Sequence, residues 1–306
     1  MTTKVAVTGA SGFVGSVLCR MLRGRGYEAI PIGRDLLEDG AGRLEAALTG
    51  ASAVIHLAAR AHVMAERHAD PLAEYRRVNL SGALAVAEAA RKAGVRRFVF
   101  VSSIGVHGTG SGDRIFKETD APAPTEPYAV SKLEAERELR SLAQGSAFEL
   151  AIVRPPLVYG PHVKGNFLRL LRLVRRGVPL PLGSVHNLRS YVGVENLCDF
   201  LVLCAFHDAA AGGLFLVADG EDVSTPELLR ILACGMKLPA RVFPFPMSLL
   251  RLAASMAGKS AELQRLTANL RVDASAARNT LGWQPKVTLQ AGLVEMAQWF
   301  AGEVSR

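Results

Sequence analysis

The chain has 306 residues, of which 49% are hydrophobic and 21% are charged, and its net charge is +8. These values are typical of a folded globular protein and exclude a disordered chain. The arginines are dispersed and are not interleaved with aromatic residues, so the positive charge favours an anionic small molecule as the partner and not a nucleic acid.

The four cysteines lie far apart and form no CxxC pair. This spacing predicts neither a disulfide framework nor a zinc site, and it indicates a cytoplasmic protein without a bound metal. A strand pattern begins within a few residues of the N-terminus, so we expect no signal peptide. The apolar stretch 201–218 is interrupted by polar residues, and 245–257 is too short to span a bilayer. We therefore expect no membrane insertion.

The first motif is a glycine-rich loop between a short apolar strand and a helical pattern. In a dinucleotide-binding fold, the first glycine permits a tight turn, the second lets the backbone approach a pyrophosphate, and the third lets the helix pack closely on the strand. The free N–H groups at the helix N-terminus then face the phosphates. The spacing is GxxGxxG, which differs from GxGxxG. We expect this loop to bind a cofactor through Gly9, Gly12, Phe13, Val14 and Gly15.

A second strand over 29–32 ends next to Arg34 and Asp35. The dinucleotide fingerprint places an acidic residue about 20 residues after the glycines, where it holds the adenosine ribose. Arg34 can accept a 2′-phosphate at this position, whereas Asp35 can bind a ribose hydroxyl. Both NAD and NADP therefore remain open as cofactors.

The next strand, 53–59, ends in small residues. Their size lets a cofactor lie against the backbone of Leu57, Ala58 and Ala59. A helix that starts at Asp70 then directs Asn79 toward the sheet. A buried asparagine needs hydrogen-bonding partners, so Asn79 is either a structural bridge or part of a proton relay.

Polar side chains follow the strand 97–101, where Ser103 lies at the carboxyl end. Doubly wound sheets bind ligands at this edge. The helix that opens at Pro127 carries Tyr128 and Lys132 four residues apart on one face. A cation beside a tyrosine favours its phenolate, so this pair can handle protons. The same spacing also arises by chance in many surface helices.

Six motifs occur in one order with consistent spacing: TGxxGxxG, HLAA, VNLSG, VSS, YAVSK and RPPLVYGP. Together they resemble the extended short-chain dehydrogenase/reductase family, in its NAD-dependent epimerase/dehydratase branch that acts on nucleotide sugars. The resemblance covers nearly the whole chain and implies an α/β fold, a doubly wound parallel Rossmann sheet with a smaller C-terminal α/β lobe. It assigns 1–160 and 189–218 to the NAD(P)-binding core, and 161–188 and 219–306 to the substrate lobe.

The resemblance also implies a catalytic set of Ser103, Tyr128, Lys132 and Asn79. Tyr128 would exchange a proton with a sugar hydroxyl while the nicotinamide exchanges a hydride with the same carbon. Ser103 would orient the sugar oxygen, and Lys132 would hold the nicotinamide ribose and bias Tyr128 toward phenolate. Asn79 would support this network. The cofactor would further contact Pro155, Leu157 and Val158.

Four residues are implied as contacts of a UDP-sugar substrate. Asn166 would donate to the diphosphate, and Leu180 lies in a segment that would run along the uracil ring. Arg189 is the first choice for a phosphate clamp. Arg265 is the second. The alternative for each arginine is a solvated side chain.

The 4,6-dehydratases of this family carry Thr-Asp-Glu where this chain has Ser103, Ile104 and Gly105, and the last two residues can be neither acid nor base. Dehydration is therefore not expected. Two reactions at C4 of a UDP-hexose or UDP-N-acetylhexosamine remain. The resemblance as a whole favours a 4-epimerase, whereas Arg34 and a short second crossover favour an NAD(P)H-dependent UDP-4-keto-6-deoxyhexosamine reductase of surface polysaccharide synthesis.

A third interpretation is a nucleotide-sensing Rossmann protein without catalysis. The complete set of Ser103, Tyr128 and Lys132 argues against it. The resemblance also implies a homodimer in which the helices that hold Asn79 and Tyr128 pair across a two-fold axis.

Overall fold

A computed structural model describes residues 2–38, 41–61 and 70–303. Its largest element is a six-stranded parallel sheet with the strand order β2-β1-β3-β4-β5-β8. The order reverses between β1 and β3, so the sheet is doubly wound. The expected α/β Rossmann fold is confirmed. The strands are β1 (Lys4–Thr8), β2 (Glu28–Ile32), β3 (Ala51–His56), β4 (Arg97–Val101), β5 (Glu149–Arg154) and β8 (Leu214–Leu216).

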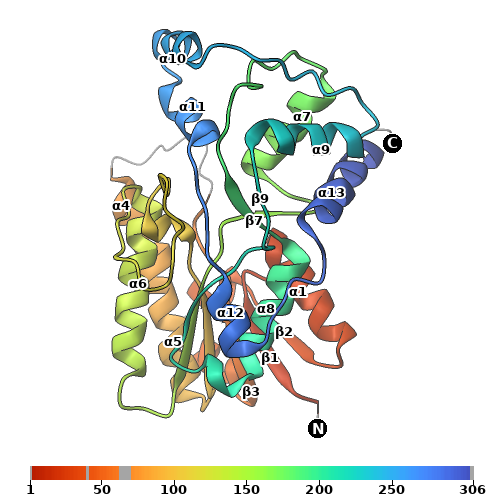
Figure 1. The fold of residues 1–306 in the computed structure, drawn as a ribbon. Coiled ribbons are helices and arrows are strands. Elements are labelled where there is room, and N and C mark those ends of the chain that lie inside the picture. Colours follow the sequence, from red (N-terminus) through yellow and green to blue (C-terminus); the bar gives the residue numbers. More distant parts are fainter. Residues whose placement is uncertain (1, 39–40, 62–69, 304–306) are drawn as a thin grey trace.

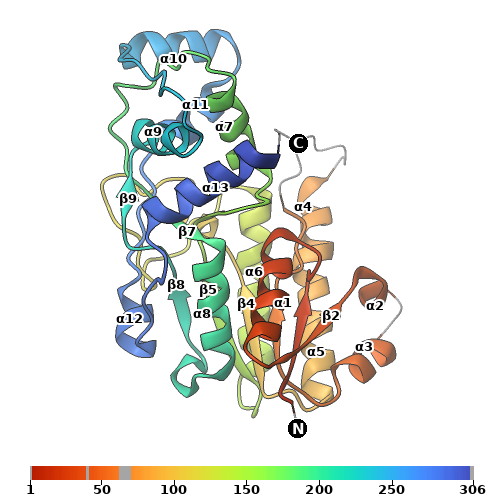
Figure 2. The same cartoon turned by 90° about the vertical axis from the view of Figure 1, so that its right-hand side faces the viewer.

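Helices cover both faces of the large sheet (Figures 1 and 2). α1 (Phe13–Gly24) and α8 (Val194–Phe206) pack on one face. α3 (Ala41–Leu48), α5 (Gly82–Lys92) and α6 (Pro127–Ala143) pack on the other face. Both faces of each strand are therefore buried, which explains why the strands read as continuous apolar runs in the sequence.

The connection between β2 and β3 is short, as its polar sequence indicated. It contains α2 (Arg34–Glu38) and α3, each of which is shorter than α1, α5, α6 and α8. After β3 the chain runs through α4 (Pro71–Tyr75) and a π-helix (Arg76–Ser81) directly into α5. Asp70 caps this long helical segment by accepting a hydrogen bond from the Ala73 N–H at 3.0 Å.

The second lobe contains a small sheet with the order β6-β7-β9. Its strands are β6 (Leu157–Tyr159), β7 (Arg189–Gly193) and β9 (Asp222–Val223). Three helices enclose its apolar core: α7 (Gly165–Arg175), α9 (Thr225–Gly235) and α13 (Leu289–Glu303). Two further helices lie outermost in Figure 1, α10 (Met247–Met256) and α11 (Ser260–Thr267).

One part of the C-terminal region belongs to the core of the large sheet, whereas we had expected 219–306 to lie wholly in the substrate lobe. Ala277 and Leu281 of α12 (Ser275–Leu281) are buried in that core together with Trp283. The Trp283 Nε1–H donates to Asp199 at 3.0 Å and so ties this segment to α8. α12 contacts β8 at the edge of the large sheet. A short amphipathic helix has no sequence signal that tells which of two cores it will join.

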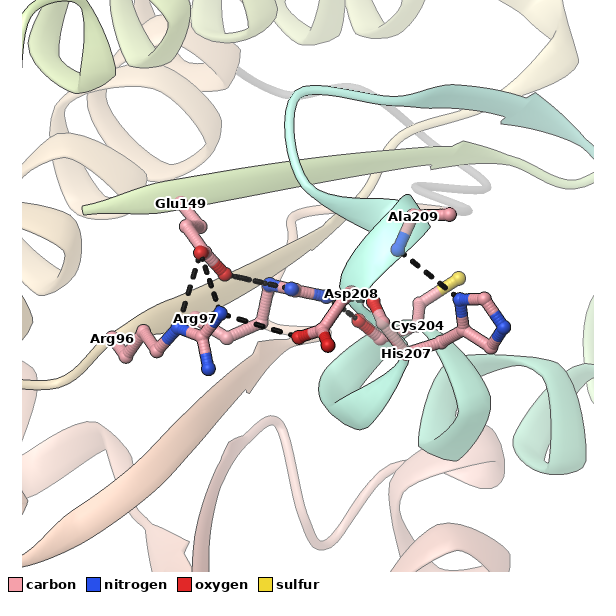
Figure 3. A network of polar contacts seen from close by, with 7 residues as sticks. All are labelled: Arg96, Arg97, Glu149, Cys204, His207, Asp208 and Ala209. Carbon is pink, nitrogen blue, oxygen red and sulfur yellow. Dashed lines mark hydrogen bonds and ion pairs between the residues drawn. The ribbon is translucent and has the colours of Figure 1, made fainter. Parts of the chain in front are cut away.

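A buried arginine joins the amino ends of β4 and β5 to the end of α8 (Figure 3). Arg97 is 3% exposed and donates to Glu149 on β5 at 2.7 and 2.9 Å. It also donates to the carbonyl oxygens of Cys204 and His207, at 2.5 and 2.9 Å. These carbonyls lie at the C-terminus of α8, where carbonyl groups lack α-helical partners, and the His207 oxygen also accepts from the Ala210 N–H at 3.0 Å. One guanidinium therefore contacts this helix end and the carboxylate together. No helix among the described residues combines the length and the apolar character needed to cross a bilayer.

The close contact between the glycine loop and α1 can be tested with two substitutions. A Cβ on Gly15 would lie 2.2 Å from the Gly9 carbonyl oxygen, whereas a Cβ on Gly24, at the exposed end of α1, would meet no atom within 4 Å. We predict that Gly15→Ala lowers the free energy of unfolding by about 1–3 kcal/mol through overpacking. Gly24→Ala should raise it by up to about 1 kcal/mol. Denaturant unfolding of both variants checks this, and equal effects would contradict it.

Candidate active site

The glycine loop after β1 forms a cradle at the carboxyl edge of the large sheet. Gly9 has φ +67°, and a Cβ on it would lie 2.9 Å from the Ala58 N. The Gly12 N–H donates to the Gly9 carbonyl oxygen at 2.9 Å, which closes the turn. The backbone of Leu57, Ala58 and Ala59 follows β3 beside this turn. A backbone this close to the N-terminus of α1 leaves room for a pyrophosphate but not for side chains, and so fits a dinucleotide.

Thr8 holds this cradle together, a role that its place in the sequence did not indicate. Its Oγ1 accepts hydrogen bonds from the N–H groups of Leu57 and Ala58, both at 3.1 Å. It also hydrogen-bonds to Nδ1 of the buried His56 at 3.0 Å. Burial and the charge of Lys132 lower the pKa of His56 to about 3, so this imidazole is neutral at physiological pH. In the sequence, the signal for this contact was that Thr8 and His56 are polar residues at the carboxyl ends of two apolar strands.

Asn79 is fully buried in the π-helix and forms a structural bridge. Its Oδ1 accepts from the Arg60 N–H at 2.7 Å, and its Nδ2 donates to the Arg60 carbonyl at 3.2 Å and to Ser131 Oγ at 3.0 Å. Ser131 Oγ then donates to the Tyr128 carbonyl oxygen at 2.8 Å. Asn79 therefore ties the loop after β3 to the first turn of α6. The local π-helix, a form that is frequent at functional sites, contains this asparagine.

Tyr128 and Lys132 lie on one face of α6, as the sequence predicted. Lys132 is buried, and its Nζ lies 4.1 Å from the centre of the Phe100 ring. Burial lowers the pKa of Lys132 to about 7. Burial, followed by the neighbouring Tyr75, raises the pKa of Tyr128 to about 12. The bias of Tyr128 toward phenolate by Lys132 remains a prediction.

Ser103 lies at the same edge, directly after β4. Its Oγ accepts from the Gly105 N–H at 3.1 Å and caps a short 3₁₀-helix, Ile104–His107. A Cβ on Gly105 would lie 3.4 Å from Ala129 Cβ and 3.4 Å from Ser103 Oγ. The turn after Ser103 therefore packs against the residue that follows Tyr128. The structure brings the predicted serine and tyrosine to the same end of α6.

A buried ion pair that the sequence analysis missed lies one helical turn beyond Lys132. Glu136 of α6 is 2% exposed and accepts from Arg154 of β5 at 2.9 and 2.5 Å. It also accepts from the hydroxyl of Ser102. Arg154 Nη1 hydrogen-bonds to His107 Nε2 at 2.8 Å. Burial and the charge of Arg154 lower the pKa of His107 to about 4, so the ring is neutral and its Nε2 accepts. The sequence signal was a glutamate four residues after the lysine.

The residues predicted to contact the two ends of the cofactor lie at the carboxyl edge of the large sheet. Arg34 and Asp35 are exposed at the start of α2, directly after β2. The Pro155 carbonyl accepts from the Ile104 N–H at 2.9 Å, which brings the segment after β5 next to the turn after Ser103. Leu157 and Val158 follow in β6. Their cofactor contacts remain predictions.

A cavity of about 660 Å³ lies beyond the N-terminus of α6. Arg265 of α11 lines it and donates to Glu126 at 2.7 Å. Arg189 contacts the backbone of the same region. Its Nη1 donates to the carbonyl oxygens of Arg265 at 2.8 Å and Ala268 at 3.1 Å. Met247 and Arg251 of α10 are in the lining as well.

The remaining two predicted substrate residues do not line this cavity. Asn166 is exposed in the first turn of α7. Leu180 is 9% exposed and belongs to the apolar core of the second lobe, where its backbone pairs with Arg241 and Phe243 at 2.7 and 3.0 Å. A leucine in this core position supports the segment through packing, and its contact with a base remains a prediction.

The buried ion pair can be tested with a charge-neutral isostere. Glu136→Gln leaves the Arg154 guanidinium without its carboxylate in a buried position, and we predict a loss of about 3–5 kcal/mol in the free energy of unfolding. Glu138→Gln, on the exposed side of the same helix, should change it by less than about 0.5 kcal/mol. Denaturant unfolding measures both. Similar small effects for the two variants would show that the pair does not stabilise α6.

Comparisons with known proteins agree with this geometry. The family model described as the NAD dependent epimerase/dehydratase family matches residues 5–218. The chain is 42% identical to a UDP-glucose 4-epimerase from Vibrio cholerae, over 98% of this chain and 96% of that protein. It is 29% identical to a GDP-6-deoxy-D-mannose reductase from Pseudomonas aeruginosa, over 96% and 95% of the two chains.

A solved structure extends the agreement to the whole architecture. MoeE5 in complex with UDP-glucose and NAD superposes with a TM-score of 0.77 and 28% identity, over 98% of this chain and 99% of that one. The cradle after β1, the serine, tyrosine and lysine at the sheet edge, and the match over residues 5–218 lead to one assignment. This chain is a member of the NAD-dependent epimerase/dehydratase family.

Proposed function

We propose that this protein is a UDP-sugar 4-epimerase that transfers a hydride at C4 of a UDP-hexose or UDP-N-acetylhexosamine. The observation that carries the proposal is the arrangement of Ser103, Tyr128 and Lys132 beside the glycine cradle, in a chain 42% identical to a UDP-glucose 4-epimerase. NAD that stays bound through the cycle suits this reaction, because the hydride removed from C4 returns to C4 on the other face.

Each side chain of the set has a separate task in this reaction. Tyr128 exchanges the proton of the C4 hydroxyl, and Ser103 hydrogen-bonds to the same oxygen. Lys132 holds the nicotinamide ribose. The bound nicotinamide supplies the hydride acceptor and donor. With a pKa of about 12 the tyrosine is a poor base, so proton removal requires a positive charge to come beside its ring when the site fills.

The positive groups around the cavity support an anionic nucleotide sugar as the substrate. Arg265 is the better-supported phosphate ligand because its side chain lines the cavity. Arg189 donates to the Arg265 carbonyl oxygen at 2.8 Å, so we assign Arg189 to positioning the end of α11. Asn166 and Leu180 remain part of the proposal as a diphosphate donor and a wall of the uracil site.

The alternative function is an NAD(P)H-dependent 4-keto reductase. Arg34 favours it, because an exposed arginine directly after β2 suits a 2′-phosphate. The 29% identity with a GDP-6-deoxy-D-mannose reductase supports the same class of reaction. This enzyme would release its cofactor after each turnover.

Three organisational features belong to the proposal. Residues 1–160 and 189–218 form the cofactor-binding part, and most of 161–188 and 219–306 forms the substrate part, with α12 as the exception found above. The exposed sides of α5 and α6 pair in a homodimer, and sedimentation equilibrium measures that state. The enzyme works in the cytoplasm.

The retained cofactor distinguishes the two reactions. The protein is purified, denatured, and its released nucleotide is identified. An epimerase retains NAD and interconverts UDP-glucose and UDP-galactose, or their N-acetyl forms, without added coenzyme. Activity that appears only with NAD(P)H and a 4-keto sugar would overturn the epimerase proposal in favour of the reductase.

The tyrosine can be tested by removing its hydroxyl alone. We predict that Tyr128→Phe lowers kcat by about 100-fold or more, because proton exchange at C4 is lost. NAD binding should persist, since the glycine cradle is unchanged. Tyr27→Phe, whose ring stacks on Phe206 far from the sheet edge, is the matched control and should keep normal turnover. Full activity of Tyr128→Phe would refute the assignment.

A further inference from the structure

Helix α10 has apolar residues on two faces. Met247 and Leu250 are partly buried and pack against the core of the second lobe. Leu249, Leu252 and Met256 follow an i, i+3, i+7 pattern on the opposite face and are 52%, 58% and 83% exposed. The remaining side of α10 is polar, and large apolar side chains exposed on a helix face indicate a contact with a partner. The outer face of α10 therefore has the composition of a contact surface.

Exposed apolar side chains are concentrated in this part of the molecule. Phe243, which is 41% exposed, precedes α10 in the segment Phe243-Pro244-Phe245-Pro246. Together with the three residues of the outer face, it accounts for four of the eight large hydrophobic residues that are exposed in the described chain. Exposed apolar groups that are concentrated in one part of a protein mark interaction sites. We call Phe243, Leu249, Leu252 and Met256 the α10 patch.

The sequence around the α10 patch is predominantly basic, with Glu227 and Glu262 at its two ends. Residues 228–261 include five basic residues and no aspartate or glutamate. This stretch thus contributes +5 to the net charge of +8. All five side chains are exposed. They are Arg230, Lys237, Arg241, Arg251 and Lys259.

We propose that the α10 patch docks on an anionic membrane surface, with α10 lying flat in the headgroup region. Leucine side chains on one face of a helix, flanked by lysine and arginine, are typical of interfacial helices, and Phe243 adds an aromatic ring in the segment before α10. Anionic lipids attract such basic residues, and each contributes about five-fold to binding near the surface. Figures 1 and 2 show α10 at the outer end of the second lobe, away from the large sheet, so a flat surface can approach it.

Charge argues against a second copy of this chain as the occupant. A two-fold symmetric contact through the α10 patch would bring the same surface of both copies together. Both copies would then bring their excess of basic residues near this contact, and like charges across an interface oppose association. An anionic surface neutralises the same charges instead.

Docking through α10 would also place the candidate substrate cavity at the membrane surface. Met247 and Arg251 of α10 line this cavity, so the helix forms part of its wall. The site of the proposed epimerase would then open at the level of the lipid headgroups. Binding to the membrane does not require turnover, so this inference and the proposed function can fail separately.

The test is co-sedimentation of the full chain with two kinds of vesicle. One contains equal parts of phosphatidylglycerol and phosphatidylcholine, and the other contains phosphatidylcholine alone. We expect at least about ten-fold tighter binding to the anionic vesicles, and a loss of this difference when NaCl rises from about 50 to about 500 mM. Equal binding to both vesicles, or no binding to the anionic ones, would overturn the proposal.

Two sets of variants assign the binding to the α10 patch. Leu249→Ser/Leu252→Ser/Met256→Ser should weaken binding to anionic vesicles by about ten-fold or more. Lys259→Glu should weaken it by about five-fold or more, whereas Lys92→Glu, on the exposed end of α5, should leave it unchanged. Thermal unfolding and turnover without vesicles should stay at the wild-type level for the triple variant. Vesicle binding unaffected by the triple variant would overturn the proposal, as would self-association that this variant abolishes in the absence of vesicle binding.

Discussion

The buried ion pair between Glu136 and Arg154 fixes the helix on which the candidate active site depends. It joins α6 to β5, and the Ser102 hydroxyl brings in β4. At the first turn of α6, the hydrogen bond from Asn79 to Ser131 joins the same helix to the loop after β3. These two buried polar contacts therefore hold the part of α6 that carries Tyr128 and Lys132. A helix position fixed in this way lets the tyrosine and lysine side chains meet a ligand in one geometry.

Because α6 is held in this way, Lys132 stays in a buried position that is unfavourable for its positive charge. A lysine that is 1% exposed loses hydration, which lowers its pKa to about 7. The carboxylate of Glu136, one turn further along the helix, acts in the opposite direction and raises that pKa. The Phe100 ring at 4.1 Å provides the other contact for the ammonium. Lys132 is thus held close to the point where it gains or loses its proton at neutral pH.

Much of the fold and the centre of the site could be predicted from the sequence, because both depend on local patterns. The apolar runs and glycine spacing predicted the sheet and the cradle, and the spacing from Tyr128 to Lys132 predicted their shared helix face. The sequence did not reveal Thr8, Glu136 or Arg154, because their roles arise from pairs of residues that meet only in the folded chain. The return of α12 to the large sheet was missed for the same reason. The two candidate phosphate ligands were also hard to order, since Arg265 lines the cavity whereas Arg189 contacts the backbone of Arg265 and Ala268.

In the proposed epimerase, the hydride leaves C4 of the sugar and returns to the same carbon. Incubation with UDP-glucose deuterated at C4, followed by NMR and mass analysis of the product, follows this hydride. We expect UDP-galactose that retains the deuterium at C4, without exchange into water and without released NADH. Loss of the deuterium to the solvent, or its stoichiometric appearance in free reduced cofactor, would contradict the claim.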